Sequence, residues 1–125
     1  MTHLLYVALG GAVGASLRHL VNVAGLRLLG SHFPWGTAVV NVVGSFVMGL
    51  FIAFLARHAV GSQELRLFVA TGLLGGFTTF SAFSLDFALL WERGAVSLAL
   101  AYALGSVVLS IAALFAGLSI SRAWA

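Results

Sequence analysis

Apolar residues fill the chain in four long stretches, which short polar connectors separate. The stretches cover residues 4–29, 35–56, 65–91 and 95–121. A helix needs about 20 mostly apolar residues to cross the hydrocarbon core of a bilayer, so each stretch is long enough for one crossing. The pattern therefore predicts an all-α membrane protein with four transmembrane helices.

The connectors carry the helix-breaking and charged residues that are typical of a membrane surface. They comprise residues 30–34, 57–64 and 92–94, and Pro34 stands where a helix can begin without losing a needed hydrogen bond. No basic run precedes the first stretch, so we expect a retained first helix rather than a cleaved signal peptide. No repeat or composition shift divides the chain. We predict one four-helix transmembrane domain over residues 1–125.

The third stretch contains a segment that disfavours a continuous helix. Gly75 and Gly76 are followed by the β-branched pair Thr78 and Thr79, and both residue types are poor helix formers. We therefore expect the third helix to be broken in mid-membrane. Carbonyl groups freed at that depth are tolerated only if they are buried or line a cavity, where they commonly bind a cation. Two GxxxG motifs, Gly10/Gly14 and Gly72/Gly76, predict close helix packing.

Polar residues recur every fourth position in two of the predicted helices, so each set shares one helical face. The two columns are Thr37, Asn41 and Ser45, and Tyr102, Ser106 and Ser110. Hydroxyl and amide groups in a membrane either bond neighbouring helices together or line a polar pathway. All these donors are uncharged, and the acids Glu64, Glu92 and Asp86 stand away from the span centres. A pathway of this kind suits a small anion rather than a cation or a proton relay.

Phenylalanines follow the glycine pair at helical spacing. They are Phe77, Phe80, Phe83 and Phe87. Such a stripe is commonly a packing surface. An aromatic ring also has a positive edge, so rings turned edge-on would hold an anion that has lost its water. Both interpretations remain open from the residues alone.

Composition excludes several classes of protein. The chain is 62% hydrophobic and 7% charged with a mean hydropathy of +1.13, whereas a water-soluble domain has about 25% charged residues. Six arginines and three acids give a net charge of +3, too scattered for a nucleic-acid-binding surface. There is no cysteine, and the four histidines lack metal-ligand spacing. No set of nucleophile, base and acid is present, so we do not expect an enzyme.

The arginines give little preference for one orientation in the membrane. With four crossings, one side holds Arg57, Arg66 and Arg122 and the other holds Arg27 and Arg93. Because positive residues normally mark the cytoplasmic side, three against two barely selects a direction. A chain that inserts both ways can pair with an opposite copy of itself. We therefore hypothesise an antiparallel, dual-topology homodimer.

Three motifs in order resemble the Fluc fluoride channels, also called CrcB proteins, over essentially the whole chain. They are residues 10–18, residues 36–41 with Gly44, and residues 75–84. The resemblance implies a fluoride-selective channel in the plasma (inner) membrane of a prokaryote, built as an antiparallel dimer with two pores. Such a channel lets cytoplasmic fluoride leave passively and protects the cell from its toxicity. Its partners would be fluoride, a second copy of the chain and the lipid bilayer, with no nucleic acid.

The resemblance also implies roles for individual residues. The ring edges of Phe80 and Phe83 would contact fluoride, Asn41 would supply a pore amide, and the polar track of the fourth helix would be Tyr102, Ser106 and Ser110. The carbonyl groups of Gly75 and Thr78 would hold a structural sodium ion (Na⁺) at the dimer interface, with no organic cofactor. Arg18 would lie in a vestibule near the pore, although snorkelling to the interface is an equal interpretation. Two positions, Ala82 and Asp86, depart from the usual Thr and Glu of the family.

Two other functions compete with a fluoride channel. Small drug/proton antiporters are also four-span, dual-topology dimers, but they need a mid-membrane carboxylate, and Asp86 lies toward the end of the third span. A non-transporting assembly subunit is the second alternative. Fluoride flux through liposomes separates all three.

Overall fold

The computed structural model describes residues 1–58 and 62–123, and this part of the chain has four helical segments that are long and apolar enough to span a membrane. The first two are α1 (Thr2–Leu29) and α2 (Trp35–His58). The fourth is α6 (Val96–Ala123). Each begins and ends within two residues of the stretch predicted from the sequence. Residues 59–61 of the second predicted connector lie outside the described residues.

The third span consists of several shorter elements. They are α3 (Gln63–Arg66), η1 (Leu67–Leu74), α4 (Gly75–Phe77) and α5 (Ser81–Glu92). The segment η1 is a π-helix, which the sequence did not predict. Between α4 and α5 the backbone leaves the helical conformation, because Thr78 is extended with φ −84° and ψ 159°. The α5 helix then begins with the Ala82 N–H donating to Thr79 Oγ1 at 3.2 Å.

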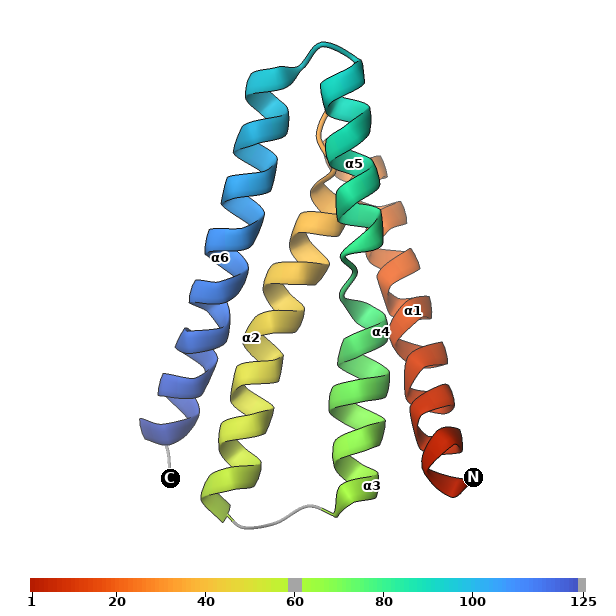
Figure 1. The fold of residues 1–125 in the computed structure, drawn as a ribbon, viewed down its shortest axis with the longest axis vertical. Coiled ribbons are helices and arrows are strands. Elements are labelled where there is room, and N and C mark those ends of the chain that lie inside the picture. The colour runs from red at the N-terminus through yellow and green to blue at the C-terminus, as the bar shows by residue number, and fades with distance from the viewer. Residues whose placement is uncertain (59–61, 124–125) are drawn as a thin grey trace.

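The four spans run alternately up and down (Figure 1). The start of α1, the end of α6 and α3 lie at one end of the bundle. The opposite end holds the connectors after α1 and after α5, where Gly30 and Gly94 have φ values of 86° and 87°. Only glycine adopts these angles without steric cost, so both connectors depend on it.

Glycine also sets how closely the helices approach. The two predicted GxxxG motifs face each other, as expected: a Cβ atom at Gly14 would overlap the Leu73 carbonyl of η1, and one at Gly76 would press on the Gly11 carbonyl. Gly49 of α2 and Gly117 of α6 make a similar contact, in which neither has room for a side chain. The pairs α1–η1 and α2–α6 therefore pack backbone to backbone, an arrangement suited to a membrane, where the hydrophobic effect does not drive helices together.

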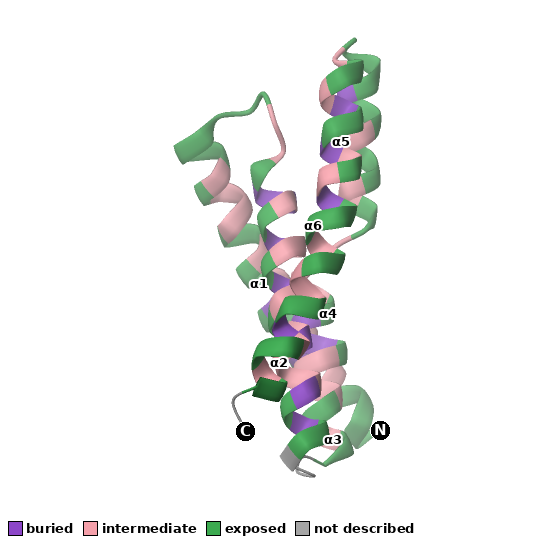
Figure 2. Cartoon of the chain, turned by 90° about the vertical axis from the view of Figure 1, so that its left-hand side faces the viewer, coloured by how far each residue is buried: buried purple, intermediate pink, exposed green. Residues whose placement is uncertain are grey.

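Little of the apolar surface is buried within the chain, as Figure 2 shows by the predominance of exposed and half-buried segments. Only 11–28% of the most apolar window in each span is buried. The small interior includes Val40, Ala99 and Tyr102. Outward-facing leucine, valine and phenylalanine side chains on all four spans need lipid or another protein to cover them. The chain is a multi-pass membrane protein.

Candidate functional site: an uncharged cleft between three spans

A cleft of about 460 Å³ opens midway along the spans, between α2, the α4–α5 junction and α6. We call it the central cleft. None of its lining side chains carries a formal charge. Seven of the nine predicted site residues line the central cleft. Five of them belong to α2 and the third span, and two belong to α6. These are Asn41, Gly75, Thr78, Phe80, Phe83, Ser106 and Ser110.

Asn41 makes two hydrogen bonds with one residue of the non-helical segment. Its Nδ2 donates to the Thr79 carbonyl at 3.0 Å, and its Oδ1 accepts from the Thr79 N–H at 2.8 Å. The side chain is half-buried and lines the central cleft. Asn41 therefore joins α2 to the third span at the point where that span leaves the helical conformation.

Phe80 and Phe83 lie next to each other on the wall of the central cleft. Their ring centroids are 5.6 Å apart and the ring planes are tilted by 44°. Phe80 is 76% exposed, as are many apolar side chains on the outward faces of the spans. The rim of an aromatic ring is positive, so a phenylalanine whose edge points into the cleft would attract an anion.

Ser106 and Ser110 bring hydroxyl groups to the cleft from α6. Both Oγ atoms are buried, and neither has a hydrogen-bond partner among the described residues. A buried hydroxyl without a partner costs about 1–3 kcal/mol. Two such groups, one helical turn apart in the same cleft, mark a place where a ligand or water would complete their hydrogen bonding.

Tyr102 belongs to the same column but does not line the central cleft. Its ring packs against Phe83 with centroids 5.1 Å apart, and only 1% of the residue is exposed. Its hydroxyl donates to Asp86 Oδ2 at 3.0 Å. Tyr102 and Phe83 therefore stand between the central cleft and a second cleft, which Asp86 lines.

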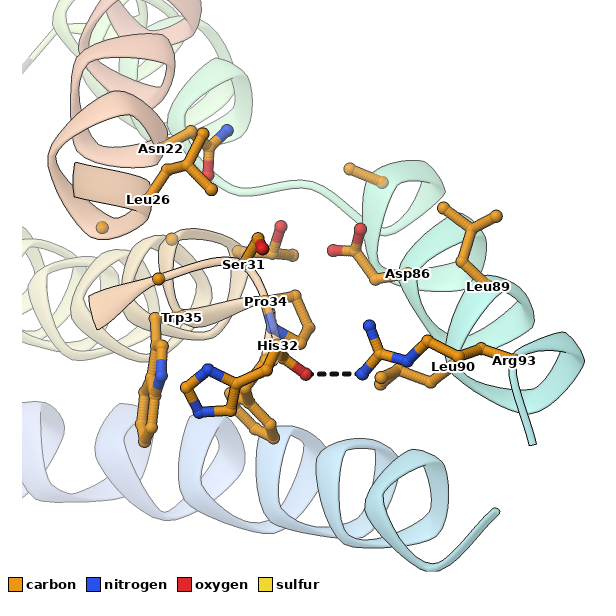
Figure 3. Close-up of a pocket in the computed structure, with 16 residues that line it drawn as sticks. Asn22, Leu26, Ser31, His32, Pro34, Trp35, Asp86, Leu89, Leu90 and Arg93 are labelled. Carbon is orange, nitrogen blue, oxygen red and sulfur yellow. Dashed lines mark hydrogen bonds between the residues drawn. The ribbon is translucent and has the colours of Figure 1, made fainter. Parts of the chain in front are cut away.

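The second cleft, which we call the end cleft, lies beside the connector that follows α1 and has a volume of about 360 Å³ (Figure 3). Asn22, Asp86 and Arg93 reach it from α1, α5 and the residue after α5. Arg93 donates to the His32 carbonyl at 2.6 Å, which fixes this connector to the end of α5. Unlike the central cleft, the end cleft contains charged groups of both signs.

Arg18, predicted to lie in a vestibule, is not part of the lining of either cleft. It is half-buried on α1, and its Nε donates to the Gly76 carbonyl at 3.0 Å. In a continuous helix this carbonyl would accept from the N–H four residues later. Arg18 therefore satisfies a carbonyl that the end of α4 leaves without its usual partner.

Gly75 and Thr78, the residues predicted to hold sodium, both line the central cleft. Their carbonyl groups lack the usual helical donors. The Thr79 N–H, which would bond the Gly75 carbonyl in a helix, donates to Asn41, and the Ala82 N–H, which would bond the Thr78 carbonyl, donates to Thr79 Oγ1. Free carbonyl oxygens are the ligands that hard cations prefer. No group of His, Cys, Asp or Glu able to hold a metal occurs among the described residues.

Comparison with known proteins identifies the family. Residues 5–118 match the sequence model described as CrcB-like protein, Camphor Resistance (CrcB). The chain belongs to the CrcB family. It is 63% identical over 122 residues to a protein of Mesorhizobium japonicum, covering 98% of both chains, and 55% identical over 122 residues to one of Agrobacterium fabrum, again covering 98% of both. A Rhizobium leguminosarum relative is 54% identical over the full 125 residues. All three are named fluoride-specific ion channel FluC.

In this CrcB-family chain, sequence reasoning gave no separate role to Thr79 and Gly44. Thr79 pairs with Asn41 through its backbone and with the Ala82 N–H through its side chain. Gly44 lies one turn after Asn41, and a Cβ atom there would overlap the Thr78 methyl group. The spacing of Asn41 and Gly44 places them on one face of α2, and this spacing was the available sign of a contact surface. Both residues contact the segment whose glycines and threonines predicted an irregular backbone.

Proposed function

We propose that this chain forms a fluoride-selective channel through which cytoplasmic fluoride leaves passively, protecting the cell from fluoride toxicity. The observation that carries the proposal is the pair of buried hydroxyls of Ser106 and Ser110, which have no partner among residues 1–58 and 62–123, in a cleft without formal charge. The names of the relatives support the same substrate.

The chemistry of the cleft explains how a fluoride ion would pass. Fluoride is small and strongly hydrated, so a purely apolar constriction would reject it more strongly than chloride. Hydroxyl groups of Ser106 and Ser110 and the ring edges of Phe80 and Phe83 would replace part of its water. Selectivity arises because a narrow site of this kind fits a small anion better than a large one. Uncharged donors also avoid holding the ion so tightly that it cannot leave.

The path would continue past Tyr102 toward the end cleft. Tyr102 and Phe83 are in ring contact between the two clefts, so movement from one cleft to the other would take an ion past both rings. Arg18 would contribute positive charge near the α4–α5 junction while its Nε remains bonded to Gly76. We propose that the non-helical residues between α4 and α5 lie at mid-membrane, which makes the third span a broken helix.

The working unit that we propose is an antiparallel homodimer with dual topology in the plasma (inner) membrane of a prokaryote. The support is the near balance of arginines and the large outward-facing apolar surface. The Gly75 and Thr78 carbonyls, freed from their helical donors, fit a structural Na⁺. When bound, the ion would supply positive charge to carbonyl oxygens buried between the two copies.

Fluoride release from liposomes tests the proposal. Purified protein reconstituted in liposomes loaded with potassium fluoride should release fluoride when valinomycin lets potassium follow, as measured with a fluoride electrode. An imposed pH gradient should not change the rate, because no carboxylate lines the central cleft, where fluoride would exchange its water for protein donors. Release that occurs only with a proton gradient would favour an antiporter, and liposomes that stay impermeable would favour an assembly subunit.

A further inference from the structure

The two hydrogen bonds between Asn41 and Thr79 have the pattern of a backbone pair. A primary amide carries one carbonyl oxygen and an N–H group, the same acceptor and donor that a peptide group offers. Asn41 uses both on a single residue, with Nδ2 bound to the Thr79 carbonyl and Oδ1 bound to the Thr79 N–H. The side chain thus pairs with one residue of the non-helical segment as a neighbouring backbone would.

We propose that Asn41 is a positioning residue that holds the Thr79 backbone in place and so fixes the shape of the α4–α5 junction. This inference rests on the proposed channel function, in which Asn41 supplies a pore amide, and it develops the alternative that the amide bonds neighbouring helices together. The main effect of Asn41 is exerted through Thr79. Since one of the two Nδ2 hydrogens remains free, a direct contact with an ion in the cleft is compatible with this role.

The first consequence concerns the carbonyl of Gly75. In an unbroken helix the Thr79 N–H would bond that carbonyl. Because Asn41 Oδ1 takes the N–H at 2.8 Å, the carbonyl of Gly75, a residue that lines the central cleft, is left without this donor. Asn41 therefore keeps available one of the two carbonyls that we assign to sodium.

The second consequence concerns Phe80, which directly follows Thr79 in the chain. Phe80 is 76% exposed and makes its ring contact with Phe83, so little other packing determines its position. Fixing the Thr79 peptide fixes the origin of the Phe80 side chain. A loosened junction would move one ring relative to the other.

Gly44 independently supports the proposal that α2 positions the α4–α5 junction. It lies three residues after Asn41, on the same helical face, and the Thr78 methyl group occupies the place of its missing side chain. Thr78 cannot simply rotate away, because its Oγ1 donates to the Leu74 carbonyl at 3.0 Å. Asn41 binds Thr79 while Gly44 makes room for Thr78, so α2 matches two successive residues of the junction.

A spectroscopic experiment tests the proposal directly in the full-length protein. The chain has five threonines, so ¹⁵N-threonine labelling gives a simple amide spectrum in lipid bilayers, and loss of one signal in Thr79→Ser identifies Thr79. Asn41→Leu should shift the Thr79 amide signal and leave those of Thr2 and Thr71 in place. The control Ser45→Ala removes a hydroxyl from the same cleft and helix and should not move Thr79. An unchanged Thr79 signal in Asn41→Leu would overturn the proposal, as would an equal shift in Ser45→Ala.

Asn41→Asp serves as a second variant should Asn41→Leu not fold. The carboxylate has the same shape and still accepts from the Thr79 N–H, but it cannot donate to the Thr79 carbonyl. The Thr79 amide proton should therefore stay protected from exchange with solvent in Asn41→Asp. Rapid exchange of that proton in the folded variant would count against the pairing.

A double-mutant cycle connects the pairing to fluoride flux. Replacing the peptide N–H of Thr79 by an ester oxygen, through incorporation of the α-hydroxy acid, removes the donor to Asn41 without changing a side chain. Asn41→Leu and the ester should each slow fluoride release, and combining them should add little, with a coupling of about fivefold or more. Ser45→Ala combined with the ester should be additive.

Additive effects for Asn41 would assign it to the ion alone and end the positioning proposal. Failure of the unmodified protein to release any fluoride would instead refute the channel function. In that case the amide spectrum still decides the pairing, so the two failures are distinguishable.

Discussion

At the scale of single residues, the central cleft combines two buried hydroxyl groups with two phenylalanine rings on one wall. The Oγ atoms of Ser106 and Ser110 have no hydrogen-bond partner in the part of the chain that the structure describes, and Phe80 is largely exposed. Each buried hydroxyl without a partner lowers the stability of the chain, because its desolvation is not compensated. Two such hydroxyls in one cleft favour a role in ligand binding rather than in folding.

Ser106→Ala and Ser110→Ala should separate function from stability. Each should reduce fluoride flux about tenfold or more, because one hydrogen bond to a charged ion is worth about 1.5–3 kcal/mol. The melting temperature in detergent should stay the same or rise, since an unsatisfied polar group has been removed. Ser16→Ala is a matched control, because the Ser16 hydroxyl bonds the Ala12 carbonyl on exposed α1. Full flux in both α6 variants would remove these hydroxyls from the pathway.

Phe80→Ile and Phe83→Ile should each abolish fluoride flux while leaving assembly intact. Isoleucine preserves an apolar side chain but has no positive ring edge to offer an anion. The matched control is Phe115→Ile, which alters a phenylalanine that is 60% exposed on α6 and does not line the central cleft. The measurement is initial fluoride efflux per reconstituted protein. Normal efflux in both cleft variants would refute the aromatic mechanism.

At the scale of helices and junctions, close packing by glycine positions the third span against α1. Gly14 has no room for a side chain because the Leu73 carbonyl lies against it. Gly76 of α4 likewise lies against the backbone of α1, at Gly11. Arg18 then bonds the Gly76 carbonyl near the end of α4. The α4–α5 junction is thus held from one side by α1 and from the other by Asn41 of α2.

Gly14→Ala should destabilise the protein by about 1–3 kcal/mol, because the added methyl group overpacks a contact between two backbones. Gly105→Ala is the control, since a Cβ atom there meets nothing within 4 Å, and alanine should favour the α6 helix. Thermal unfolding in detergent compares the two. Equal melting temperatures would mean that α1 and η1 are not held as closely as described.

The elements were largely predictable from the sequence, whereas the contacts between them were not. Apolar runs and their connectors are local signals, so the four spans were predicted to within two residues. The poor helix formers at 75–79 marked the irregular region for the same reason. Spacing along one helix places residues on a common face but does not say which groups on another helix they meet. The bonds from Asn41 to Thr79, from Tyr102 to Asp86 and from Arg18 to Gly76 therefore emerged only from the structure.

At the scale of the whole molecule, the outward-facing apolar surface and the balanced arginines bear on how copies of the chain lie in the membrane. A small charge bias leaves both orientations accessible to insertion. Antiparallel copies would place an end cleft at each membrane surface. The same arrangement would bring together the Gly75 and Thr78 carbonyls of both copies, where a sodium ion would offset their partial negative charge.

A single introduced cysteine can measure orientation, because the natural chain has none. Ser31→Cys places a thiol in the exposed connector between α1 and α2. If both orientations insert equally, a membrane-impermeant maleimide should label about half of the protein in intact cells and the rest after permeabilisation. Complete labelling, or none, from outside would contradict dual topology.

In the channel that we propose, uncharged donors and aromatic edges replace the water around a small halide. The most direct test is simultaneous measurement of fluoride and chloride release from liposomes that contain the purified protein and equal concentrations of both ions. Fluoride should leave rapidly, and chloride should leave no faster than from protein-free liposomes. Chloride release as fast as fluoride release would contradict this mechanism.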